Sequence, residues 1–127
     1  MAGAYRTQAD LINQALKNLG VLSAGNAADP EDFAFVEENV DPMIRTLASL
    51  DICYIGDPDN ISGELFLPLA AVLADMCASK FGSTAEDQAA LNAKGLGTPP
   101  GVGAGATMLR QINRGRPTYE TLRTHSF

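Results

Sequence analysis

Few residues of this 127-residue chain are of a type and spacing that could do chemistry. The one histidine, His125, stands near the C-terminus without a second ligand to share a metal ion and without a buried base to pair with. The two cysteines, Cys53 and Cys77, sit among apolar residues and lack a Cys-x-x-Cys spacing, so we expect free thiols that behave as small hydrophobic side chains. We therefore predict no catalytic residue, no metal site and no cofactor, and a protein that is not an enzyme.

Acidic and glycine-rich stretches give equally weak signals of ligand binding. The stretch 57–60 (DPDN) lacks the 1-3-5 oxygen pattern and the terminal bidentate glutamate of a calcium loop, so it predicts a turn. GLGTPPG and GVGAGA have no preceding strand, no Lys-Ser/Thr pair and no following helix to make a phosphate-binding loop. The carboxylate pairs Glu37-Glu38 and Glu86-Asp87 are expected on exposed, solvated helical faces.

Charge divides the chain into an acidic body and a basic tail. The 9 basic and 15 acidic residues give a net charge of −6. Residues 1–94 carry 14 of the acidic residues and 5 of the basic ones, a net −9, whereas residues 95–127 carry four arginines and Glu120, a net +3. The acidic total argues against a conventional nucleic-acid-binding protein, whose affinity comes from neutralising phosphates. A body and a tail of opposite charge can pair between neighbouring copies.

The length and apolar content indicate one soluble domain. The hydrophobic fraction is 46%, which is ordinary for a globular protein. No apolar run approaches the ~20 residues that cross a bilayer, and the N-terminus lacks the apolar stretch of a signal peptide. We therefore expect a soluble protein that is made in the cytoplasm.

The clearest helix signal lies near the N-terminus. Thr7 and Asp10 have the spacing of a capping box, which predicts a helix over residues 8–19. Gly20 supplies the left-handed residue that ends a helix. The apolar residues of this segment fall on one helical face: Leu11, Ile12, Ala15, Leu16 and Leu19.

A second helix is predicted to open at Asp29-Pro30, with the aspartate as cap and the proline at the first helical position. Its apolar residues are spaced as in a helix-packing seam: Phe33, Val36, Val40, Met43, Leu47 and Leu50. Pro42 interrupts this seam, and a proline in a helix interior costs about 3 kcal/mol. One kinked helix and two shorter helices are both possible, and the unbroken seam favours the single helix.

A loop and two more helices are expected next. Residues 51–63 are rich in Asp, Asn, Gly and Pro and predict a loop, whose apolar Ile52, Tyr54 and Ile55 hold it to the bundle or to a neighbouring subunit. Residues 65–81 are apolar over most of the helix circumference, which predicts a buried central helix. If it begins near residue 66, Pro68 lies in its first turn.

The main face of this central helix is apolar: Leu65, Leu69, Val72, Leu73, Met76 and Cys77. Gly82 ends it, and Ser83 and Thr84 then cap a short fourth helix through Lys94.

The helical pattern collapses from Gly95 onward. GLGTPPGVGAGA holds too many glycines and prolines to bury a face, and only a short helical turn near residues 107–112 is possible. Beyond it we expect an extended chain that becomes ordered on contact. The sequence thus predicts an all-α protein, with a small four-helix bundle over residues 1–94 and a Gly/Pro-rich linker and extended basic C-terminal arm over residues 95–127.

Four stretches in this order resemble the head-to-tail adaptor proteins of tailed bacteriophages, also called connectors, tail accessory or packaged-DNA-stabilisation proteins. They are residues 7–21 (TQADLINQALKNLGV), the acidic second helix with its seam, residues 64–82 (ELFLPLAAVLADMCASKFG) and residues 116–127 (RPTYETLRTHSF). The family typically opens with Thr, an acidic residue three later, two aliphatic residues, Ala-Leu and Leu-Gly-Val. Together the similarity touches about 100 residues, roughly one domain's worth.

The resemblance implies a virion structural protein at the head–tail junction. In the family, a helical bundle joins a twelve-fold ring beneath the portal protein, extends the DNA channel, retains packaged DNA and presents a platform for tail or nozzle proteins. The C-terminal arm clasps the portal or a sister subunit. An acidic channel would repel the backbone of double-stranded DNA, which therefore passes without tight binding. The residues expected to bind partners lie in the arm: Arg110, Arg114, Arg116, Tyr119, Leu122, Arg123 and Phe127.

Two other interpretations stay open. One is a small helical nucleic-acid-binding protein, such as a terminase-like DNA-recognition subunit with its basic tail on DNA, for which affinity would fall steeply with salt. The other is a bacterial regulatory or toxin–antitoxin partner with a disordered recognition tail, for which copurification with one small partner would be expected.

Overall fold

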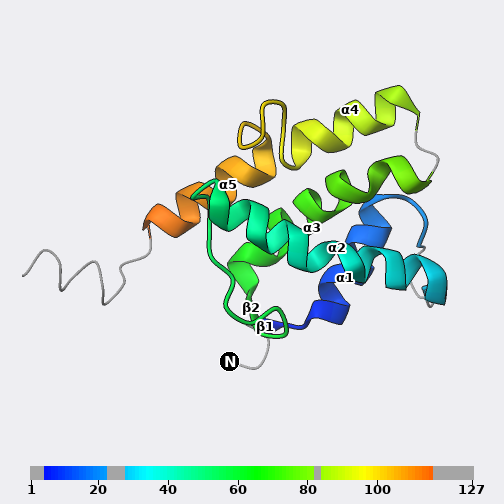
Figure 1. Ribbon diagram of the computed structural model, residues 1–127, viewed down its shortest axis with the longest axis horizontal. Helices are drawn as coiled ribbons and strands as arrows, with labels where there is room; N and C mark the ends of the chain where they lie inside the picture. Colours follow the sequence, from blue (N-terminus) through cyan, green and yellow to red (C-terminus); the bar gives the residue numbers. More distant parts are fainter. Residues whose placement is uncertain (1–4, 23–27, 82–83, 116–127) are drawn as a thin grey trace, which may run out of the picture.

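The computed structural model describes residues 5–22, 28–81 and 84–115, with the side chains of Tyr5 and Arg114 left out. Over these ranges the chain is mostly helical (Figure 1). The helices are α1 (Gln8–Asn18), α2 (Pro30–Ser49), α3 (Gly63–Cys77), α4 (Ala85–Lys94) and α5 (Ala104–Gly115), and a 3-10 turn, η2 (Ala78–Phe81), extends α3. The two-residue strands β1 (Tyr5–Arg6) and β2 (Ile61–Ser62) pair antiparallel.

Helix α3 is the centre of the molecule, and each of the other four described helices contacts it (Figure 1). Nine of its residues are buried: Leu65, Phe66, Pro68, Leu69, Ala70, Val72, Leu73, Ala74 and Cys77. The predicted buried central helix is therefore confirmed, although Met76 on its predicted face is only half-buried.

The start of α1 agrees with its sequence signal. The Thr7 hydroxyl accepts from the Asp10 N–H, and an Asp10 carboxylate oxygen accepts from the Thr7 N–H, each at 3.2 Å. Both bonds of the capping box are therefore present. The loop before α3 adds a third partner, because Asp59 Oδ1 accepts from the Gln8 N–H at 3.2 Å. The β1–β2 pair, next to this contact in the sequence, joins the segment before α1 to the end of the loop.

Helix α2 runs without interruption through Pro42, as the seam predicted. Asp29 caps it by accepting from the Glu31 N–H at 2.9 Å, with Pro30 at its first position. Leu50 was predicted to be the last residue of the seam, but it lies just past the end of α2 and is 37% exposed. Helix α3 also begins earlier than predicted, at Gly63, so Pro68 lies beyond its first turn and is buried there.

The four-helix bundle is not confirmed, because the described residues contain five helices. The expectation of an unpacked linker and arm from Gly95 onward is wrong for residues 95–115. Ala106 and Leu109 of α5 are fully buried against the core, and Leu96 and Ile112 pack on it. Residues 116–127 lie outside the described residues.

Candidate interaction surface

Two of the seven residues expected in the arm, Arg110 and Arg114, belong to α5, and the other five follow it in the sequence. Arg110 is half-buried on α5, and its Nη1 donates to the Gly101 carbonyl at 3.2 Å. Its placement in a free arm is therefore a wrong prediction, since this guanidinium holds the turn before α5 in place. Arg114 belongs to the last turn of α5, although its side chain is not described. The other five lie beyond the described ranges: Arg116, Tyr119, Leu122, Arg123 and Phe127.

The connection from α4 to α5 is held by one carboxylate from α3. Asp75 Oδ2 accepts from the Leu96 N–H at 3.0 Å and from Asn92 Nδ2 at 3.1 Å. Asn92 Oδ1 in turn accepts from the Thr98 hydroxyl at 2.9 Å. A short polar network thus fixes the end of α4 and the following turn on the central helix.

Glycines allow this connection to lie directly on α3. A Cβ at Gly95 would lie 2.7 Å from the Ala71 carbonyl oxygen, and one at Gly105 would lie 3.1 Å from the Pro68 carbonyl oxygen. Real Cβ atoms do not approach oxygen as closely as the first of these distances. The glycine-rich composition, which suggested an unstructured linker, instead permits close contact between backbones.

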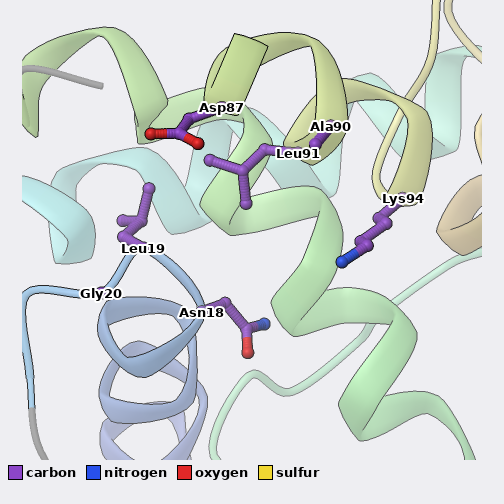
Figure 2. A pocket seen from close by; sticks show the side chains of 7 residues that line it. All are labelled: Asn18, Leu19, Gly20, Asp87, Ala90, Leu91 and Lys94. Atoms are coloured by element: carbon purple, nitrogen blue, oxygen red, sulfur yellow. The ribbon is translucent and has the colours of Figure 1, made fainter. Parts of the chain in front are cut away.

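A groove separates the C-terminal end of α1 from α4 (Figure 2). It consists of two adjoining hollows of about 170 and 290 Å³, which share Asn18, Leu91 and Lys94 in their walls. Ala71 of α3 lines the smaller hollow. The larger one is lined by Asn18, Leu19, Gly20, Asp87, Ala90, Leu91 and Lys94.

Asp87 and Lys94 lie toward opposite ends of the groove, Leu91 lies between them, and Asn18 adds a polar side chain from the α1 side (Figure 2). Leu19 and Leu91, both half-buried, come from opposite walls. Asp87 and Lys94, both exposed, lie seven residues apart on α4, which corresponds to roughly 10 Å along a helix. No residue of α4 is buried, so this wall of the groove is the least tightly packed helix of the described part.

The described surface is acidic. Of the 14 acidic residues before Gly95, only Asp32 and Asp75 are half-buried, and the others are exposed. The pairs Glu37-Glu38 and Glu86-Asp87 are exposed, as predicted. Arg45 Nε and Asp41 Oδ2 form an ion pair at 3.0 Å, and both side chains are highly exposed. Such a pair contributes little to stability.

The acidic stretch after α2 is a turn, as predicted. The Asp57 carboxylate accepts from the Asp59 N–H at 3.0 Å, and the Asp57 carbonyl accepts from the Asn60 N–H. Ile52 of the same loop is buried, whereas Tyr54 is 64% exposed. The Tyr54 hydroxyl donates to Asp51 Oδ1 at 2.8 Å, and this hydrogen bond, with the nearby negative charge, raises the pKa of Tyr54.

Both thiols are free and buried, as the sequence predicts. Burial raises the pKa of Cys53 from 9.0 to about 11 and that of Cys77 from 9.0 to about 12. The thiolate is therefore scarce at neutral pH, and a nucleophilic role is disfavoured. No group of three potential metal ligands occurs in the parts of the chain that are described, and no described helix is long and apolar enough to cross a membrane.

No family model matches this sequence, and no curated protein or solved structure is significantly similar to it.

Sequence reasoning allowed only a short helical turn at residues 107–112, within the longer α5 (Ala104–Gly115), and it missed the groove. Ala106, Leu109 and Ile112 recur every three residues, which is a helical spacing, but the glycines before them masked the signal. The groove had no comparable signal, because it is a gap between two helices that are distant in sequence.

Proposed function

We propose that this chain is a virion structural protein, a head-to-tail adaptor that forms a ring beneath the portal of a tailed bacteriophage. In this proposal α1–α4 are the four-helix bundle of the adaptor, α5 is the base of its C-terminal arm, and residues 116–127 are the arm. The ring extends the DNA channel and retains packaged DNA. The order of the four family-like stretches carries the proposal.

The structure supports this proposal through the placement of those stretches. Residues 7–21 contain α1 with its complete capping box, and residues 64–82 contain all of α3 except Gly63, so these two family-like stretches of the body are packed helices. The exposed carboxylates suit a channel wall along which DNA slides, because they repel phosphates.

The position of α5 also supports an arm that starts later than Gly95. Helix α5 leads away from the rest of the molecule toward its C-terminal end (Figure 1), and Pro117 follows it closely in the sequence. The arm then has two arginines and three large apolar residues for contact with other proteins: Arg116, Tyr119, Leu122, Arg123 and Phe127. One arm binds weakly if it loses conformational entropy on contact, and twelve arms in a ring bind with high avidity.

Assembly with the portal protein of the same phage tests the proposal. We expect the full chain to form a ring beneath the portal, visible by electron microscopy, and a chain that ends at Gly115 to lose portal binding by at least tenfold. A chain whose residues 116–127 are shuffled, with composition and charge unchanged, is the matched control and should also bind poorly. Failure of the full chain to bind the portal would overturn the proposal.

The same preparation separates the adaptor from a nucleic-acid-binding protein. An adaptor should bind double-stranded DNA weakly, whereas a DNA-recognition subunit should bind tightly at 50 mM salt and lose affinity steeply by about 200 mM. Tight, salt-sensitive DNA binding that depends on residues 116–127 would replace the adaptor with that alternative.

A further inference from the structure

The C-terminal end of α4 is tied to two neighbouring helices. The Asp75 carboxylate of α3 accepts from Asn92 Nδ2 at 3.1 Å and from the Leu96 N–H at 3.0 Å. The Gly95 carbonyl accepts from the Ala106 N–H of α5 at 3.1 Å. Ala106 is fully buried, so this end of α4 is held against the core through both α3 and α5.

The start of α4 is more open. Its cap is a contact within the segment itself, because the Thr84 hydroxyl accepts from the Asp87 N–H at 3.1 Å. Leu91, in the second half of the helix, is half-buried and packs on the core. A segment with so little burial moves at a lower cost than a packed helix. Five of the first six residues of α4 are exposed: Ala85, Glu86, Asp87, Ala89 and Ala90.

Hollows lie along both sides of α4. On the α1 side is the groove, whose α4 wall consists of Asp87, Ala90, Leu91 and Lys94 (Figure 2). This spacing places the four residues on one face of the helix. On another face, a hollow of about 420 Å³ separates α4 from the end of α3. The start of α4 can therefore move sideways with little steric resistance. The second hollow is lined by Asp75, Ala78, Ser79, Gln88, Ala89, Asn92 and Thr98.

We propose that α4 is a hinged wall of the groove. Residues 92–95 are the hinge, and residues 85–90 swing toward the end of α1 or away from it. Movement toward α1 narrows the groove and covers Leu19, whereas movement away widens the groove and exposes this side chain. The inference goes beyond the adaptor function and does not depend on it, because it uses contacts within one chain.

The connection to the 3-10 turn η2 limits the swing. Only three residues separate Ala85 from Phe81 in the sequence. The Phe81 ring packs edge-on against Phe35, with the ring centroids 5.9 Å apart, and this contact holds the end of η2 on α2. The start of α4 therefore moves within the reach of a short connection and does not detach from the molecule.

Distances between spin labels on α1 and α4 test the hinge. The full chain first receives Cys53→Ala and Cys77→Ala, so that labels attach only at introduced thiols. One label is placed at Lys17→Cys, and the second at either Glu86→Cys or Ala93→Cys. All three sites are exposed, and none lines the groove. Double electron–electron resonance should give a distribution of distances about twice as wide for the 17–86 pair as for the 17–93 pair. Equal widths would overturn the inference.

Two substitutions distinguish the swinging part from the hinge. Leu91→Ala removes the apolar contact of α4 with the core, so it should widen the 17–86 distribution by about 1.5-fold and leave the 17–93 distribution unchanged. Asp75→Asn weakens the hinge and should widen the 17–93 distribution. Leu67→Ala is the matched control, an exposed leucine of α3 that should change neither pair. If Leu91→Ala widened both pairs equally, α4 would move as one rigid body and the hinge would be absent.

NMR relaxation dispersion of the unaltered full chain is a second measurement, which needs neither labels nor cysteine replacement. The amides of residues 86–90 should show exchange broadening on the microsecond to millisecond timescale, and those of residues 92–96 should show at least threefold less. Broadening of the same size in both segments, or in neither, would contradict a hinge at the C-terminal end of α4.

Discussion

Helices α3 and α4 lie side by side but are held in the molecule by different forces. Helix α3 buries nine residues and contacts the other four described helices. Helix α4 buries none, and its end is fixed by the bonds of Asp75 to Asn92 and Leu96 and by the close approach of Gly95 to α3. Apolar burial therefore fixes α3, whereas α4 is fixed by directional hydrogen bonds, by backbone contact and by the half-buried Leu91, which packs on the core.

This difference suits the two helices to different tasks. A helix with many buried side chains cannot move without opening cavities, because protein interiors are close-packed. A helix without buried side chains can adjust to a bound segment at a small cost in packing. The groove lies between α4 and α1, so one of its walls can adapt while its α3 floor remains fixed.

Among the predictions that test this difference between α3 and α4, removal of a buried side chain from α3 should lower the free energy of unfolding most. Leu73 is fully buried, and Leu73→Ala should lower the free energy of unfolding by about 3 kcal/mol, because it leaves a cavity in the core. Leu67→Ala is the matched control on the same helix, where the side chain is 63% exposed, and should change stability by less than about 0.5 kcal/mol. Urea denaturation measures both, and equal losses would mean that α3 is not the packed centre.

Addition of a methyl group at the contact between α3 and the end of α4 should cause the next largest loss of stability. The added Cβ of Gly95→Ala would lie 2.7 Å from the Ala71 carbonyl oxygen and from Asp75 Cβ, so α4 must move away at a cost of about 2 kcal/mol. Gly56→Ala is the control, since nothing lies within 4 Å of its added Cβ. If the two variants are equally stable by thermal and urea denaturation, backbone contact does not fix α4.

The same glycines show why the sequence predicted one part of the molecule well and another poorly. The capping box at Thr7 and Asp10 is a local signal, and the structure contains both of its hydrogen bonds. A glycine can have two opposite effects: it can make a segment flexible, or it can allow two backbones to pack in direct contact. Which applies at Gly95 and Gly105 depends on α3, which is remote in the sequence, so local composition gave the wrong prediction for residues 95–115.

The candidate site also has one part that could be predicted from the sequence and one part that could not. The chemistry of residues 116–127 is visible in the sequence, because it depends on residue types alone. The groove is not visible there, since Leu19 and Leu91 are brought together by helix packing. Arg110 illustrates both points: the sequence gives its charge, but its hydrogen bond to Gly101 removes it from the arm.

The two buried thiols report on whether the core is closed. Burial raises the pKa of Cys53 to about 11 and of Cys77 to about 12 from 9.0, so the folded state keeps its protons where the unfolded chain loses them. Their contribution to stability is complete below pH 9 and is lost as the pH rises toward 11–12. We expect the free energy of unfolding to fall by about 1.5 kcal/mol between pH 8 and 9.5.

A variant with both Cys53→Ala and Cys77→Ala is the control for this pH dependence. Its free energy of unfolding should fall less over the same range, because other groups alone then titrate. Thiol-specific reagents should also modify the folded protein at least 100-fold more slowly than the unfolded chain at about pH 8, since the thiolate is the reactive form. Rapid modification of the folded protein would contradict the closed core.

Loss of the Asp75 charge should have the smallest effect, and one confined to the α4 side. Asp75→Asn weakens the acceptor for the Leu96 N–H and Asn92 Nδ2 but leaves the core intact, so the free energy of unfolding should fall by only about 1 kcal/mol. Hydrogen exchange should accelerate in residues 92–103 while the amides of α3 stay protected, because the variant loosens α4 without opening the central helix. Asp32→Asn is the control, a half-buried aspartate on α2 far from this connection in the sequence. If exchange in α3 rose as much as in the connection, the two helices would unfold as one unit and the groove would have no independently adjustable wall.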